Sequence, residues 1–324
     1  MNDFIKLLLC FTLSFFLCSI GCKKYIHYSK KKEYKQFIRK DIVTTHQKKQ
    51  GTPTMGGSII FLSTIASFIL FVPQFYKDNQ MLSVFFIFLF FALIGLMDDL
   101  FKIIYKNSDG LSASIRLLLE IIGSIVAIYI MNKHQIDHLH IPLTHYAIPL
   151  GSFLILYYIF VIVGTANAVN FSDGLDGLAS GLMISALLPF LLIALKNRNY
   201  SLSFFIISFL GSLAGFLRYN FNPAKLFMGD VGSLSMGALY AMIAIVLKNE
   251  LLILISGFLF FLEIISVILQ VGFFKLSHGK RIFKMAPIHH HFEKKGVPEW
   301  KVVMSFWMIG FFLAIISSMI GVIG

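Results

Sequence analysis

Charged residues are scarce in this sequence. They make up 14% of the 324 residues, whereas hydrophobic residues make up 57% and the mean hydropathy is +0.80. A soluble globular domain has about 25% charged and about 45–50% apolar residues. The shortage excludes a water-soluble fold and intrinsic disorder, and it indicates that lipid is the solvent. The net charge of +12 therefore gives no reason to expect a nucleic-acid partner.

Cysteine is almost missing as well. The three cysteines, Cys10, Cys18 and Cys22, lie in the first apolar segment, and no cysteine elsewhere could pair with them. This excludes a disulfide framework and a cysteine metal site. The segment could be a cleaved signal or a lipoprotein-like processing site, but we interpret it as a retained span. The sequence also lacks a GxxxxGK[ST] phosphate loop, an HExxH zinc motif and a visible internal repeat.

Long, unbroken apolar runs are what the sequence has instead. A helix needs about 20 residues to cross about 30 Å of hydrocarbon, and the runs do not show the ten-residue alternating segments of a membrane barrel. We therefore predict an all-α, polytopic integral membrane protein, in which residues 1–324 form one domain with about ten transmembrane helices. The predicted spans are 4–22, 58–72, 81–97, 115–131, 147–166, 178–195, 201–217, 234–247, 251–274 and 302–322.

The basic residues predict the orientation of these spans. Of the 28 Lys and Arg residues, 22 lie in the odd-numbered loops. By the positive-inside rule those loops are cytoplasmic and both termini are external. The predicted cytoplasmic loops are about 23–57, 98–114, 167–177, 218–233 and 275–301.

Five of the sixteen acidic residues lie in three short patches, each at the end of an apolar run and in a predicted cytoplasmic loop. The patches contain Asp98 and Asp99, Asp173 and Asp176, and Asp230. We expect them to converge on one site at the cytoplasmic surface. Adjacent carboxylates repel unless a cation neutralises them, so Asp98 and Asp99 indicate a base or a metal-linked pair. The alternative is a helix cap whose charge is answered by Lys102.

Polar residues repeat at every third position in Asn167, Asn170, Asp173 and Asp176. On a helix they would spread over roughly half of the circumference. Amides and carboxylates in such an arrangement suit hydrogen bonds to a base, a ribose or a sugar. Because Asn, Asp and Gly are also common turn residues, the alternative is a capping and turn segment.

Two glycine-rich turns are candidate phosphate sites. Asp230 is flanked by Gly229 and Gly232, and Mg²⁺ bound to a diphosphate takes only one or two protein carboxylates. Segment 51–57 follows Lys49 and precedes the second span, so its backbone N–H groups could form an anion-binding nest. The alternatives are an ordinary turn residue at Asp230 and a simple helix breaker at 51–57.

Three consecutive histidines, His289, His290 and His291, lie in the ninth loop. Consecutive helix positions point in different directions, so the three cannot bind one tetrahedral metal ion. We expect a catalytic or phosphate-binding role for one or two of them. Glu120 and Glu263 fall within predicted spans, where a functional role is the default interpretation. The sequence indicates no partner for either of these carboxylates.

Taken together, the motifs resemble the polyprenyl-phosphate N-acetylhexosamine-1-phosphate transferases. The matching segments are Gly51-Thr-Pro-Thr-Met-Gly-Gly57, Asp98-Asp99, Asn167-Ala-Val-Asn-Phe-Ser-Asp-Gly-Leu-Asp-Gly177, Phe227-Met-Gly-Asp-Val-Gly232 and Met285-Ala-Pro-Ile-His-His-His-Phe-Glu293. The histidine run resembles the one found in a bacterial branch of this family, whose members transfer a phospho-N-acetylmuramoyl-pentapeptide. The departures are Phe171 and Ser172, where Leu and Thr are expected, and Arg116, where Lys is usual.

The resemblance implies an Mg²⁺-dependent reaction in which UDP-N-acetylmuramoyl-pentapeptide and undecaprenyl phosphate give lipid I and UMP. It places the enzyme in the bacterial inner membrane with its site on the cytoplasmic face, and it suggests a homodimer. It implies that Asp230 binds Mg²⁺, that Asp98 is the base for the lipid phosphate with Asp99 as its partner, and that His289 is a further catalytic residue. The residues implied to contact substrate are Lys49, Thr54, Lys102, Asn167, Asn170, Asp173, Asp176, Asn220, Phe227, Gly229, Gln270 and His290.

Other functions are compatible with parts of this pattern. A two-step route with Asp230 or Asp98 as a covalent nucleophile fits the same residues. A related transferase could use UDP-N-acetylglucosamine, although the histidine run argues against it. A secondary transporter would place its carboxylates near the bilayer centre, often on inverted repeats, whereas here they lie at span ends on one side.

Overall fold

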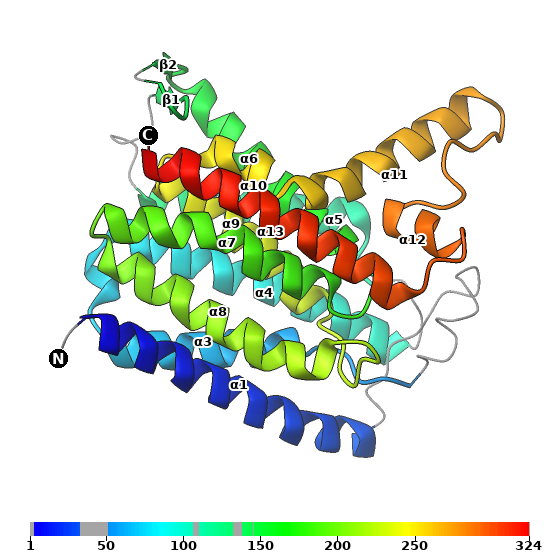
Figure 1. Cartoon of the computed structure of the whole chain (residues 1–324), viewed down its shortest axis with the longest axis horizontal. Coiled ribbons are helices and arrows are strands. Elements are labelled where there is room, and N and C mark those ends of the chain that lie inside the picture. The colour runs from blue at the N-terminus through cyan, green and yellow to red at the C-terminus, as the bar shows by residue number, and fades with distance from the viewer. Residues whose placement is uncertain (1–2, 33–50, 106–109, 132–137, 145, 324) are drawn as a thin grey trace.

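The computed structural model describes residues 3–32, 51–105, 110–131, 138–144 and 146–323. This part of the chain is a bundle of helices (Figure 1). Its long helices are α1 (Asp3–Lys32), α3 (Gly57–Phe71), α4 (Asn79–Tyr105), α5 (Ala113–Met131), α6 (Phe153–Ser172), α7 (Leu178–Lys196), α8 (Tyr200–Asn220), α9 (Asp230–Val246), α11 (Phe258–Leu276) and α13 (Glu299–Ile323). The short elements are η1 (Phe75–Lys77), η3 (Glu250–Leu252), α10 (Ile253–Ser256), α12 (Ile288–Glu293) and the antiparallel strands β1 (His138–His140) and β2 (Ala147–Pro149).

The predicted all-α membrane fold is confirmed. In the described residues, eight helices are long and apolar enough to cross a membrane, and the apolar helices α3 and α9 are shorter. These ten helices correspond in order to the ten predicted spans. Both chain ends lie at the left end of the bundle in Figure 1, as an even number of crossings requires. The cytoplasmic or external side of each end stays a prediction.

Two of the predicted spans do not form one continuous helix over their predicted length. The span predicted from residue 147 begins with strand β2, and helix α6 starts only at Phe153 but continues to Ser172. The span predicted over 251–274 is interrupted at Gly257, which separates α10 from α11. An added Cβ at Gly257 would lie 3.1 Å from the Tyr240 ring. Apolar composition alone does not mark either break, because both segments remain hydrophobic through it.

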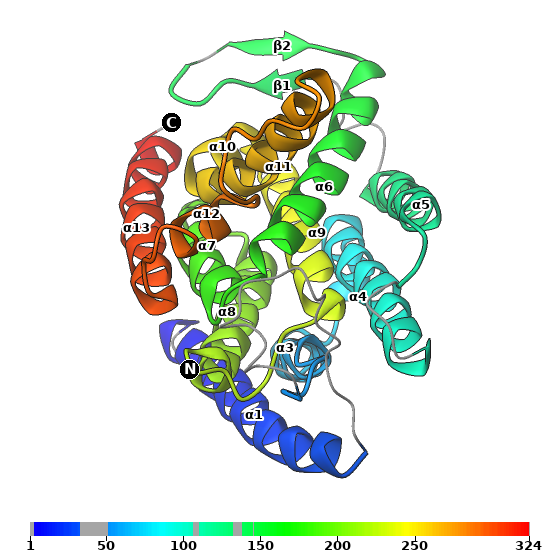
Figure 2. The same cartoon turned by 90° about the vertical axis from the view of Figure 1, so that its right-hand side faces the viewer.

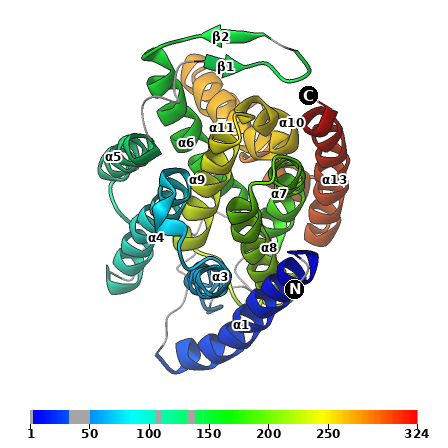
Figure 3. The ribbon, with the colours of Figure 1, turned by 90° about the vertical axis from the view of Figure 1, so that its left-hand side faces the viewer.

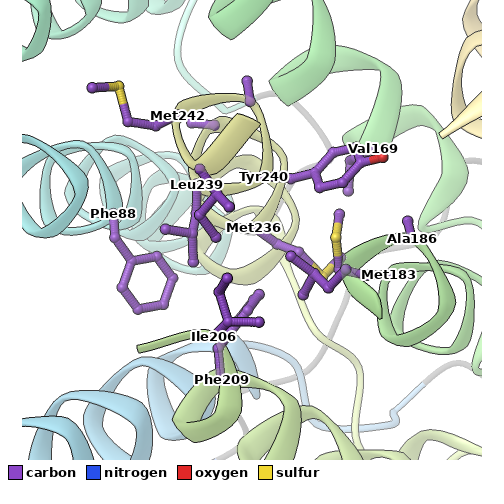
Figure 4. Close-up of a cluster of buried hydrophobic side chains, with 14 of the residues drawn as sticks. Phe88, Val169, Met183, Ala186, Ile206, Phe209, Met236, Leu239, Tyr240 and Met242 are labelled. Carbon is purple, nitrogen blue, oxygen red and sulfur yellow. The ribbon is translucent and has the colours of Figure 1, made fainter. Parts of the chain in front are cut away.

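Helix α9 is the centre of the bundle. All of its residues from Val231 to Val246 are buried, as expected for a helix that is hydrophobic on every side. Figures 2 and 3 show it surrounded by α4, α6, α7 and α3. In Figure 4 its side chains pack among Phe88 of α4, Val169 of α6 and Phe209 of α8. A helix held on all sides provides a fixed position for the residue at its start, Asp230.

Glycines allow neighbouring helices to approach the start of α9 closely. An added Cβ at Gly57 of α3 would collide with the backbone of Gly232, and one at Gly95 of α4 would collide with the carbonyl of Asp230. Only residues without a side chain permit these backbone approaches. The Gly95 contact brings the last turns of α4, which carry Asp98, against the first turn of α9.

The outer helices leave apolar surface uncovered. Helix α11 leans away from the bundle (Figure 1), and Leu276 at its end is 84% exposed. Helix α5 also presents exposed large hydrophobic residues, including Leu118 and Tyr129. Continuous apolar surface of this kind is typical of a face that contacts lipid.

Candidate active site

Three carboxylates meet where α4 passes the start of α9. Asp98 and Asp99 lie on α4, and Asp230 is the first residue of α9. One carboxylate oxygen from each lies within 4.8 Å of the others. Asp98 and Asp99 are buried, and the Asp230 side chain is 16% exposed. Two of the three predicted acidic patches, far apart in sequence, therefore form a single acidic centre.

Two cations offset this concentration of negative charge. The ammonium of Lys102 lies 2.6 Å from Asp98 Oδ2 and 2.7 Å from Asp230 Oδ2, so it bridges the two helices. The guanidinium of Arg116 on α5 is 4.0 Å from Asp230 Oδ2. Without these charges the carboxylates would repel one another. Arg116 was not among the predicted site residues.

Asp99 has a structural contact that the sequence did not reveal. Its two oxygens accept hydrogen bonds from the backbone N–H groups of Asp230 and Val231, both at 3.1 Å. These are two of the free N–H groups at the start of α9, and a carboxylate there is also favoured by the helix dipole. The helix-cap alternative therefore describes what Asp99 does, although the helix that it caps is α9. Its predicted role as partner of Asp98 in base chemistry stays a prediction.

The two asparagines of α6 have different partners. Asn170 donates to Asp230 Oδ1 and to the Ser233 hydroxyl, each at 2.8 Å, and so it orients the central carboxylate. Asn167 donates to Glu120 Oε2 at 2.7 Å and accepts from Arg116 at 3.3 Å. Asn167 therefore supports the Arg116 side chain, and its predicted contact with substrate stays a prediction.

Glu120, for which the sequence analysis named no partner, pairs with Arg116. They stand four residues apart on α5, with Arg116 Nε 3.7 Å from Glu120 Oε1. Glu120 and Asn167 thus hold the guanidinium of Arg116 beside the acidic centre. The signal was present in the i, i+4 spacing of opposite charges, which places both residues on one helix face.

The loop after α6 carries the other two predicted acids. Asp173 directly follows the helix, and burial raises its pKa well above the usual value, with further contributions from the charges of Asp230, Asp99 and Asp176. Its carboxyl therefore tends to hold a proton. Asp173 belongs to the same electrostatic cluster as the acidic centre.

Asp176 and Asn220 join two loops beside this cluster. Asp176 Oδ2 accepts from the Ala224 N–H at 2.9 Å and from the Asn222 amide at 3.2 Å. Asn220 is buried; its oxygen accepts from the Gly177 N–H at 3.1 Å, and its amide donates to the Leu226 carbonyl at 3.0 Å. Both residues thus fix the loop that leads to α9. Their predicted direct contacts with substrate stay predictions.

Two N–H groups of the glycine-rich segment 51–57 are not available for the predicted nest. Gly56 and Gly57 donate their N–H groups to the carbonyls of Phe227 and Met228, at 2.9 and 2.8 Å, and Phe227 donates in turn to Pro53 at 2.8 Å. The sequence could not show that a second loop would bind these two N–H groups. Lys49, the cation assigned to this segment, lies outside the described residues.

Gly229 and Thr54 lie against the acidic centre. Thr54 is buried, and an added Cβ on Gly229 would lie 3.0 Å from its hydroxyl and would collide with Asp99. Gly229 also has a φ of 75°, which favours glycine. The loop residue Phe227 is partly buried. Its predicted contact with substrate stays a prediction.

The three histidines turn to three partners, as their consecutive positions on α12 require. His289 is buried, with Nδ1 3.0 Å from Glu263 Oε2, and His290 Nδ1 lies 2.7 Å from Glu293 Oε2. His291 Nδ1 accepts from the Lys284 N–H at 3.0 Å. Burial, Lys295 and Lys284 lower the pKa of the His291 ring. Glu263, like Glu120, thus has a partner in the structure.

Gln270 was predicted to contact substrate, but the structure gives it another contact. Its side-chain oxygen accepts from the backbone N–H groups of Ile282 and Phe283, at 3.2 and 2.9 Å. Gln270 therefore holds the segment that leads to the histidines. A contact between Gln270 and substrate stays a prediction.

The donor set of the acidic centre fits a hard divalent cation. Asp98, Asp99 and Asp230 offer only carboxylate oxygens, the ligands that Mg²⁺ prefers. Within the described residues this is the one group of His, Cys, Asp and Glu side chains close enough to share an ion. The Lys102 ammonium lies among the same oxygens, where it neutralises part of the charge that a metal ion would neutralise.

Comparison with known proteins agrees with this geometry. Residues 81–248 match the family model "Glycosyl transferase family 4". The chain is 40% identical to the phospho-N-acetylmuramoyl-pentapeptide-transferase of Staphylococcus aureus (strain bovine RF122 / ET3-1), over 98% of this chain and 99% of that protein. It is 41% identical to the protein of the same name from Bacillus cytotoxicus and 40% identical to that from Listeria monocytogenes, over 95% of both chains in each case. The matched region contains the whole acidic centre.

Proposed function

Because the chain belongs to glycosyl transferase family 4 and is a phosphoglycosyl transferase of peptidoglycan synthesis, we propose that it makes lipid I. The donor is UDP-N-acetylmuramoyl-pentapeptide, the acceptor is undecaprenyl phosphate, and UMP leaves. The names of relatives that match over nearly the full length support this choice. The observation that carries it is the acidic centre bridged by Lys102, at the end of the bundle where the predicted cytoplasmic loops gather.

The acidic centre suits phosphoryl transfer between two anions. Such a reaction needs mainly positioning and charge neutralisation. Mg²⁺ held by Asp230 would neutralise the diphosphate and the departing UMP. Lys102 and Arg116 add positive charge beside the same carboxylates. These two cations cancel part of the charge of the three carboxylates, so a bound metal ion would supply the further positive charge that two incoming phosphates need.

The carboxylates have separate tasks in this mechanism. Asp98 accepts from the Leu111 N–H at 2.8 Å through Oδ1, while Oδ2 faces Lys102. In the proposed reaction Asp98 removes the remaining proton of the lipid phosphate, which then attacks directly. Asn170 fixes Asp230, and Asp99 fixes the start of the helix that carries Asp230. The mechanism thus needs one base, one metal ligand and two residues that orient them.

The proposal places the protein in the bacterial inner membrane with the site on its cytoplasmic face. A water-soluble nucleotide and a lipid phosphate can meet only at that surface. Helices α5 and α11, with their exposed apolar faces, flank this end of the molecule (Figure 2). As the family resemblance suggests, we propose a homodimer as the functional assembly.

An assay of the purified protein tests the proposed function. Undecaprenyl phosphate is supplied with either UDP-N-acetylmuramoyl-pentapeptide or UDP-N-acetylglucosamine, and UMP and the lipid product are measured with Mg²⁺ or with EDTA. We expect UMP and lipid I from the muramoyl donor only, and no turnover in EDTA. Turnover of UDP-N-acetylglucosamine alone would overturn the proposed donor, and full activity in EDTA would overturn the role of the metal.

A further inference from the structure

A fully buried carboxylate on α11 has no part in the mechanism described so far. Glu263 is 0% exposed and lies within a membrane-spanning helix. An uncompensated charge there is costly, so such residues have partners or functions. Its Oε2 lies 3.0 Å from His289 Nδ1 and accepts from the His289 backbone N–H at 3.3 Å. The ring nitrogen and the carboxylate oxygen are close, but they are not aligned as a hydrogen bond.

The pairing requires the chain to fold back along α11. Glu263 precedes the end of the helix, Leu276, by thirteen residues, or about 20 Å. The chain leaves the bundle along α11 and returns through α12 (Figure 1). The returning segment is bound to α11 at two points: Gln270 accepts from the Phe283 N–H, and Glu263 accepts from the His289 N–H. Because they are seven residues apart, these two anchors share one face of α11.

The other side of the His289 ring contacts the acidic loop. An added Cβ at Gly174 would lie 2.5 Å from His289 Nε2. Gly174 directly follows Asp173, which belongs to the electrostatic cluster of the acidic centre. His289 Nε2 is buried and has no hydrogen-bond partner among the residues that the structure describes. One ring nitrogen thus faces a fixed carboxylate, and the other faces the loop beside the site.

We infer that Glu263 is a positioning residue that sets the orientation and tautomer of His289. A carboxylate beside Nδ1 keeps the proton on that nitrogen and leaves Nε2 directed toward the acidic loop. There Nε2 binds a polar group of the transferred phosphosugar. This last step rests on the proposed function, whereas the pairing of Glu263 with His289 does not.

Two buried carboxylates in the chain provide a matched test. Glu263→Gln removes the carboxyl beside His289, and Glu250→Gln removes an equally buried carboxyl, 2% exposed, beyond the other end of α9. The protein is labelled with ¹⁵N-histidine, and the His289 ring signals are assigned with His289→Asn. We expect Glu263→Gln to shift these signals and to lower kcat about 100-fold, the size typical of a misplaced catalytic group. KM for undecaprenyl phosphate should stay within about twofold, and Glu250→Gln should change neither readout.

A second pair of variants covers the case in which Glu263→Gln does not fold. Glu263→Asp keeps the charge and should restore part of kcat. Gly174→Ala leaves Glu263 intact but places a methyl group against His289 Nε2, so it should also shift the His289 signals and lower kcat. Normal kcat and unshifted His289 signals in folded Glu263→Gln, or in Gly174→Ala, would overturn the inference. If the wild-type protein turned over neither UDP-sugar, the proposed function would fail, and the His289 signals would still decide the pairing.

Discussion

An acidic residue lies near each end of α9, Asp230 partly buried and Glu250 fully buried, but their surroundings differ. Asp230 at the start contacts Lys102 and Asn170 and has a second cation, Arg116, within 4.0 Å. Glu250, just after the other end, forms no salt bridge within the described residues, and burial raises its pKa to about 7. A buried carboxylate is therefore not by itself a sign of chemistry. The reactive end is distinguished by the cations and orienting amides around its acid.

Asp230→Asn should give the largest difference between the two ends. The amide keeps the shape of the side chain but loses the charge that holds a metal and pairs with Lys102. We expect kcat for UMP release to fall at least about 1000-fold, as for the loss of a central electrostatic group. Glu250→Gln, at the opposite end, should keep wild-type turnover. If Asp230→Asn retained a tenth of the wild-type rate with normal Mg²⁺ dependence, the metal assignment would be wrong.

Lys102→Met should separate turnover from metal binding. The ammonium lies among the oxygens that would bind Mg²⁺ and competes with it for them. We therefore expect turnover to fall about 100-fold, while Mn²⁺ or Mg²⁺ binds about tenfold more tightly. Isothermal titration of the metal in the absence of substrate measures the second effect. Lys248→Met, near the other end of α9, is the control, and unchanged or weaker metal affinity in Lys102→Met would contradict the competition.

The helical architecture could be predicted because apolar length and loop charge are local properties. Ten apolar runs gave ten helices in the predicted order, and eight of them, among the described residues, are long enough to cross a membrane. The errors lie where hydrophobicity continues through a change of structure, at β2 before Phe153 and at Gly257. The convergence of Asp98 and Asp230 could also be anticipated, since both lie at span ends in loops of the same predicted side.

The side-chain partners could not be predicted in the same way. Asn167 and Asn170 are one turn apart and look equivalent in sequence, yet one binds Glu120 and the other Asp230. The segment 51–57 was interpreted as a possible anion nest, but the N–H group of Gly56 binds the carbonyl of Phe227, about 170 residues later. Which of two equivalent groups binds a partner depends on the rotation of packed helices, and single-sequence patterns do not contain that information.

The smallest expected effect concerns stability at the Glu250 end. The carboxyl ionises near pH 7 in the folded protein, instead of near its usual 4.5, because burial outweighs the Tyr158 hydroxyl and the Lys248 charge. Between these values the folded state holds a proton that the unfolded state has lost. Stability from this group is therefore complete below pH 4.5, falls as the pH rises to about 7, and is constant above it. The total is about 3 kcal/mol at 1.36 kcal/mol per pH unit.

Melting temperatures of wild type and Glu250→Gln in detergent from pH 5 to 8 isolate this contribution, because all other titrating groups are shared. The variant should lack the part of the decline that wild type shows up to pH 7, and parallel curves would mean that Glu250 ionises normally and is less isolated than its burial indicates.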